Sequence, residues 1–66
     1  MEKVKIISAR HVDGNYAAEL VEEKVNAFLK NDLPKIGGKV KDIKLTACAN
    51  SAQAKYLVAA IIIYEV

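Results

Sequence analysis

Residues 55–66 read KYLVAAIIIYEV, and this stretch decides the fold. A strand with one face in water alternates apolar and polar residues, but between Tyr56 and Tyr64 neither alternate set contains a charge. The segment is therefore expected to form a strand that is covered on both faces. A chain of only 66 residues has few elements with which to cover it.

Two further strands and one helix are expected before this segment. Residues 3–11 (KVKIISARH) contain β-formers, and residues 40–49 (VKDIKLTACA) alternate apolar and polar side chains. Between them, apolar residues at i, i+3 and i+4 predict a helix over residues 16–32, capped by Asp13 or Asn15 and ended by Pro34. Turn-forming residues at 50–53 indicate a hairpin between the last two strands.

The predicted order is therefore β-α-β-β, an α+β fold in a single domain, residues 1–66. Because the last strand is the most apolar, it is expected at the centre of a three-stranded antiparallel sheet in the order 1-3-2. The helix then lies on one face. The outer strands carry most of the sheet's lysines, and charge at an edge discourages further strands from adding.

One helix covers only one face of such a sheet. We assign Leu57, Ala59, Ile61 and Ile63 to the helix face, together with Ile43 and Leu45. The opposite set is then expected to be covered by another copy of the protein, because a contiguous exposed apolar patch is typical of an interface. The predicted interface of this homo-oligomer, a dimer or larger, consists of Tyr56, Val58, Ala60, Ile62 and Tyr64.

Composition excludes several classes of site and partner. One cysteine and one histidine allow neither an intrachain disulfide nor a Cys/His zinc cluster, so no metal and no cofactor are expected. No apolar run approaches the ~20 residues of a membrane span, and no signal peptide is recognised, so a cytoplasmic protein that does not contact membranes is expected. A net charge of +2 with three tyrosines and one phenylalanine makes nucleic-acid binding the weaker alternative.

Catalytic constellations are also missing from the pattern, and we expect the protein not to be an enzyme. Cys48 needs a base to act as a nucleophile, and His11 is distant from it in sequence, so both are interpreted as structural or solvated. The acidic residues of the helix lie on its exposed side, without the density of oxygen ligands that calcium needs. The IGGK segment at 36–39 lacks the full phosphate-loop motif and is interpreted as a turn.

Positive charge gathers outside the helix. Residues 15–33 hold four acids and two lysines, net −2, and the remainder holds eight basic residues and four acids, net +4. Edge protection and solubility explain this distribution in part. The alternative is a small anionic, nucleotide-like ligand at subunit seams, since arginine and lysine bind phosphate and tyrosine offers a ring for a base or sugar. The candidate ligand-binding residues are Arg10, Lys44, Tyr56 and Tyr64.

Four segments in this order, KVKII, ELVEEKVNAFLK, VKDIKLT and YLVAAIIIYE, resemble a family of small sporulation proteins of endospore-forming bacteria with relatives in phages. That family has no assigned activity, so the resemblance implies no catalytic residues. It implies a structural role in sporulation or, for a phage relative, an inhibitor that binds a host protein or sequesters a nucleotide signal. The order β-α-β-β is also similar to dodecins, flavin-storing shells. The chain has no tryptophan to stack on a flavin, and only the architecture is taken from that likeness. The sequence thus favours a non-enzymatic homo-oligomeric binding or structural protein.

Overall fold

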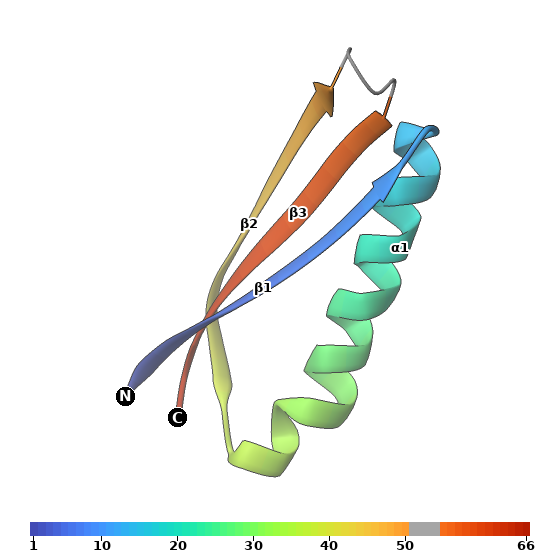
Figure 1. Cartoon of the computed structure of the whole chain (residues 1–66). Coiled ribbons are helices and arrows are strands. Elements are labelled where there is room, and N and C mark those ends of the chain that lie inside the picture. Colours follow the sequence, from blue (N-terminus) through green and yellow to red (C-terminus); the bar gives the residue numbers. More distant parts are fainter. Residues whose placement is uncertain (51–54) are drawn as a thin grey trace.

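Three strands and one helical arm form the structure, a computed structural model that describes residues 1–50 and 55–66 (Figure 1). The predicted α+β fold in the order β-α-β-β is confirmed. The turn predicted over residues 50–53 lies, after Asn50, outside the described residues. In chain order the elements are β1 (Glu2–His11), α1 (Gly14–Ala27), a π-helical turn η1 (Phe28–Asp32), a 3₁₀ turn η2 (Pro34–Ile36), β2 (Lys39–Asn50) and β3 (Lys55–Glu65).

The three strands form an antiparallel sheet in the predicted order, β1-β3-β2. In the register of the sheet, Ile61 of β3 lies opposite Ile6 of β1, and Ile62 lies opposite Ile43 of β2. The ladder of β2 has one irregularity, between Val40 and Asp42. An extra residue of this kind bends a strand and leaves one residue unpaired, here Lys41.

The two chain ends lie side by side at the start of β1 and the end of β3 (Figure 1). The amino group of Met1 donates to the carbonyl of Val66 at 2.7 Å, and the N–H of Val66 donates to the carbonyl of Met1 at 3.0 Å. These bonds extend the β1–β3 ladder beyond Glu2 and Glu65, so the central strand is paired along its whole length.

Asp13 fixes the start of α1. Its carboxylate accepts from the N–H of Asn15 at 2.9 Å and of Tyr16 at 3.4 Å, which supplies acceptors for N–H groups that have no partner in the first turn. The helix begins at Gly14, two residues before the predicted start. Sequence periodicity places the first buried residue well but not the first helical one, because the first turn is exposed.

After α1 the helical arm ends in a π-helical turn, η1, which is wider than an α-helical turn, and a 3₁₀ turn, η2, which is tighter. It continues from α1 through η1 to Asp32, the predicted end, and Pro34, which was expected to stop the helix, opens the 3₁₀ turn η2. Gly37 then adopts a left-handed conformation with φ of 65°, which a residue with a Cβ adopts only with strain. This turn reverses the chain into β2.

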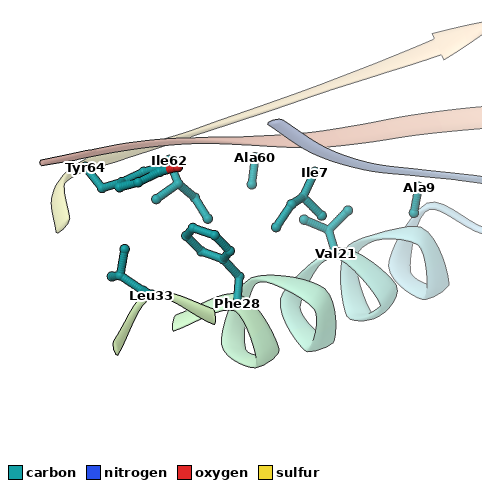
Figure 2. Close-up of a cluster of buried hydrophobic side chains, with 8 residues drawn as sticks. All are labelled: Ile7, Ala9, Val21, Phe28, Leu33, Ala60, Ile62 and Tyr64. Atoms are coloured by element: carbon teal, nitrogen blue, oxygen red, sulfur yellow. The ribbon is translucent and has the colours of Figure 1, made fainter. Parts of the chain in front are cut away.

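Apolar side chains fill the space between α1 and the sheet (Figure 2). Phe28 points from the helical arm toward β3, and its ring meets the ring of Tyr64 edge to face with centroids 5.5 Å apart. Ile62 and Ala60 have no exposed surface, and Val21 of α1 is 2% exposed. Burial of these side chains, each of the larger ones worth about 1.5–3 kcal/mol, holds the helix on the sheet.

The core corrects the face that was predicted for β3. Ala60, Ile62 and Tyr64 are buried beneath the helical arm, so the set Tyr56, Val58, Ala60, Ile62 and Tyr64 lies on the helix side and not away from it. The set Leu57, Ala59, Ile61 and Ile63, predicted to meet the helix, lies on the other face. Ile43 and Leu45 are on the helix side as predicted, opposite Ile62 and Ala60.

Close packing of the helix explains which set faces it. Ala9, Ala17 and Ala60 are buried where α1 crosses β1 and β3, and small side chains there let the helix approach the sheet. The opposite register would place the larger Ile6 and Ile61 in the same space. Both alternate sets of β3 are apolar, so the pattern of polar and apolar residues does not predict which set faces the helix.

Candidate functional site: the open face of the sheet

One face of the sheet has no element of the described chain over it. All helical segments lie on the opposite side (Figure 1). Cross-strand partners share a face, so Val4 and Ile6 of β1 lie beside Ile63 and Ile61 of β3. Val4 is 56% exposed and Ile6 is 66% exposed. We call this surface the open face, and its apolar part consists of Val4, Ile6, Leu57, Ala59, Ile61 and Ile63.

Carboxylates lie at one end of the open face. Glu2 and Glu65 are cross-strand partners there, and Lys41 lies between them, with its Nζ 3.3 Å from Glu2 and 3.4 Å from Glu65. The hydrogen bond and charge of Glu2, with a smaller effect of Glu65, raise the pKa of Lys41 above its ordinary value of 10.5. The bulge of β2 turns Lys41 toward these carboxylates, so an irregularity of the strand builds the ion cluster.

Cations lie at the other end of the same face. Arg10 is opposite Leu57, and Lys55 occupies the same alternate set of β3 as Leu57. At the acidic end, the carboxylates of Glu2, Asp42 and Glu65 and the ammonium groups of Lys39 and Lys41 sum to one negative charge. At the basic end, Arg10 and Lys55 sum to two positive charges. The open face thus has an apolar centre between ends of opposite sign.

The structure does not bring the four predicted ligand-binding residues together within one chain. Arg10 and Lys44 lie on the open face, but their partners on β3, Leu57 and Ile61, are four residues apart. With a rise of about 3.3 Å per residue and strands about 4.8 Å apart, Arg10 and Lys44 are separated by about 16 Å. A small anion bound by Arg10 is therefore too far from Lys44 to be bound by both cations.

The two tyrosines of that set lie on the helix side. Tyr64 is 9% exposed in the core, and its ring is used in the contact with Phe28. Tyr56 packs its ring against Gly14, where a Cβ would stand 3.2 Å from the tyrosine Cγ. The sheet itself therefore separates both tyrosines from Arg10 and Lys44.

His11 and Cys48 are also on opposite faces. The N–H of Asp13 donates to Nδ1 of His11 at 3.0 Å, and the imidazole lies against Tyr16 with ring centroids 4.5 Å apart. Cys48 is exposed and lies opposite Leu57 on the open face. Among residues 1–50 and 55–66, no three His, Cys, Asp or Glu side chains gather as a metal site would require.

A second apolar surface, not anticipated from the sequence, lies between α1 and β2. The backbone of α1 lies close to β1 and β3 but not to β2, so the helix side of β2 stays uncovered by the described residues. Leu45 is 73% exposed there and Ile43 is 38% exposed. The resulting groove has a volume of about 330 Å³ and is lined by Ala18, Val21, Glu22, Val25, Asn26, Ile43, Leu45 and Val58.

The helical segments bear on one further expectation. Within the described residues, no helix combines the length and the apolar character needed to cross a bilayer.

Comparison with known proteins found no matching family model, no matching curated protein and no matching solved structure. The resemblance to sporulation proteins and their phage relatives stays a prediction.

Proposed function

We propose that the protein is a non-enzymatic homo-oligomer that assembles through the open face of its sheet. The observation that carries this proposal is the apolar centre of that face, with Val4 56% and Ile6 66% exposed beside Ile61 and Ile63. Covering a large aliphatic side chain is worth about 1.5–3 kcal/mol. A second copy covers all six apolar residues of the face at once.

Charge at the ends of the open face selects a second copy as the occupant. Two sheets that pack face to face are related by a two-fold axis lying parallel to both. When this axis is perpendicular to the strands, the Glu2 and Glu65 end of one copy lies over the Arg10 and Lys55 end of the other. An axis along the strands would bring like ends together, which costs free energy. The surface is therefore complementary to itself in one orientation.

An exchange of one side chain on the open face tests the proposal. Ile61→Asp places a carboxylate at the centre of the interface, where burial without a partner costs several kcal/mol. We expect the native protein to have a mass of at least two chains of 7.2 kDa by light scattering, and the variant to stay folded with a lower mass than the native assembly. Circular dichroism of both shows whether the fold is kept.

Ile36→Asp is the matched control, because Ile36 is 51% exposed in η2 and lies off the open face. It makes the same chemical change and is expected to leave the mass of the assembly unchanged. A native protein that is folded and monomeric at micromolar concentration would overturn the proposal. Equal dissociation by Ile36→Asp and Ile61→Asp would also count against it.

A small anionic ligand at the subunit seam is a second candidate function. It is supported by Arg10 and Lys44 lying on the same face as the proposed interface. Charge-assisted bonds from arginine and lysine to phosphate are stronger than neutral ones. A panel of nucleotides should raise the melting temperature of the native protein and not that of Arg10→Ala/Lys44→Ala. No shift with any nucleotide removes this candidate and leaves the interface standing.

A further inference from the structure

The two edges of the sheet differ in how their backbone groups are protected. At the β1 edge, Nζ of Lys24 donates to the outward carbonyl of Ser8 at 3.4 Å, and Lys5 lies on the same edge beside Phe28. Lysines at an edge discourage another strand from pairing there. The β1 edge is therefore closed by α1 and its charges.

The β2 edge carries Lys39 and Lys41 at its start, and beyond the bulge Lys44 is the one lysine of residues 43–49. The side chain of Asp42 accepts from the N–H of Ile43 at 2.8 Å, next to the bulge at Lys41. Among the described residues, no side chain bonds to the backbone of residues 44–49. Alternate residues of an edge strand direct their N–H and C=O groups away from the sheet, so this stretch presents a free hydrogen-bonding edge.

The free edge also carries uncovered apolar side chains. On the helix side of β2, Ile43 and Leu45 border the groove that α1 leaves open, and Leu45 is the more exposed at 73%. Ala47 and Ala49 continue this alternate set toward the end of the strand. An added strand would satisfy the backbone and cover this apolar stripe in one step.

We propose that β2 pairs antiparallel with β2 of a second copy, about a two-fold axis at Thr46. Thr46 is the midpoint of residues 43–49, the part of the edge that lies beyond the bulge. This register places Leu45 opposite the partner's Ala47 and Lys44 opposite the partner's Cys48. It keeps Lys44 away from the partner's Lys44, and it joins the two sheets into one of six strands.

The area of the open face gives an independent reason for this pairing. Three strands about 4.8 Å apart and about 33 Å long offer about 475 Å² of flat area. A typical stable interface buries about 800 Å² on each partner. A six-stranded sheet doubles the flat area. Edge pairing does not depend on packing of the open face, but together the two contacts build a tetramer of two sheets with the helices outside.

The native thiol gives a direct test. In the proposed register, Lys44→Cys places its thiol opposite the partner's Cys48, and cross-strand Cα atoms about 4.5–5.5 Å apart suit a disulfide. Mild oxidation should convert most of this variant to a covalent dimer on a non-reducing gel, reversed by dithiothreitol. Residues 44 and 48 of one strand are about 13 Å apart, so no intrachain bond competes.

Three controls separate this contact from others. Ser8→Cys/Ile61→Asp places a thiol on the closed β1 edge with the open-face contact removed and should give no covalent dimer, and the native protein with Cys48 alone should give none. Lys44→Cys/Ile61→Asp should still cross-link, because loss of the open-face contact leaves the edge intact. Failure of this double variant, when Lys44→Cys itself cross-links, would assign the link to the open face and overturn the edge pairing.

Register is read from two further variants. In the proposed register Thr46→Cys lies opposite the same residue of the partner and should also cross-link, whereas Asp42→Cys should not. Efficient cross-linking of Asp42→Cys in place of Lys44→Cys would keep the edge pairing and overturn Thr46 as its centre. If none of the three β2 variants cross-links while each remains folded by circular dichroism, the edge pairing is wrong.

Discussion

Ile62 and Ile63 follow one another in the chain but lie on opposite faces of the sheet. Ile62 has no exposed surface and packs beneath the helical arm, whereas Ile63 is partly exposed on the open face opposite Val4. The first side chain belongs to the folding core and the second to the proposed interface. Substitution of these two neighbours therefore separates folding from association.

Ile62→Asp is expected to unfold the protein. It buries a carboxylate with no partner beneath Phe28, at a cost of several kcal/mol, and a small domain has only about 5–15 kcal/mol of stability to lose. Ile63→Asp is expected to keep the far-ultraviolet circular dichroism of the native fold and to lower the mass of the assembly. A melting temperature reduced equally by both substitutions would contradict the assignment of faces.

Asp13 is expected to contribute to stability through the first turn of α1. Asp13→Ala removes the acceptor for the N–H groups of Asn15 and Tyr16 and should cost about 0.5–2 kcal/mol in urea unfolding. Asp13→Asn, which keeps an oxygen in place, should cost less. Loss of the cap leaves the strands unchanged, so the mass of the assembly should not respond. Equal losses in Asp13→Asn and Asp13→Ala would show that the charge of Asp13, and not the oxygen that caps the helix, matters.

Lys41 is expected to give stability a dependence on alkaline pH. Its pKa in the folded protein is raised above 10.5 by Glu2 first and by Glu65 second. The folded state therefore favours the charged ammonium form of Lys41 more than the unfolded state does. This contribution to the free energy of unfolding is complete below pH 10.5 and is lost as the pH rises through the pKa of the folded protein.

The measurement compares chemical unfolding of the native protein and of Lys41→Met across that range. The difference in stability between them should be constant below pH 10.5 and shrink above it. Because the three side chains are about half exposed, salt should reduce the difference as well. A difference that grew with pH would have the wrong sign for this ion cluster.

Arg10 is expected to matter for the orientation of the proposed face-to-face pair. Arg10→Glu places negative charge over the acidic end of the partner and should weaken association, most strongly at low salt. Lys44→Glu makes the same change in charge nearer the middle of the face and should have a smaller effect. Sedimentation at two salt concentrations measures both. An Arg10→Glu variant that associates more strongly than the native protein at low salt would favour the axis that runs along the strands, because that axis brings the two basic ends together.

Much of the fold was predictable because local patterns carry it. Alternation in residues 40–49, the helical period over residues 16–32 and the apolar last strand led to the element order and to β3 at the centre, both confirmed. Asp13 was among the two predicted caps, and it is the one that accepts from the helix N–H groups. These features depend on residues that are close together in the sequence, so the pattern of the sequence predicts them.

The candidate site was predictable only in part. Arg10 and Lys44 were named from charge and do lie on the open face, but Tyr56 and Tyr64 were assigned to it through the wrong face of β3. The clusters at its ends depend on pairs such as Glu2 with Glu65, which are distant in sequence and meet only through strand register. The bulge at Lys41 was likewise not visible in a segment that alternates well.

The amino-acid sequence alone determined the three strands and the helical arm of the described residues, together with a central strand too apolar for water on either face. Only the tertiary structure decided which face the helix covers, because both alternate sets of β3 are apolar and close packing at Ala9, Ala17 and Ala60 makes the choice. It also decided that α1 lies over β1 and β3 and leaves β2 uncovered. A helix about 10 Å wide cannot cover three strands, and its position over two of them is set by side-chain packing between distant segments.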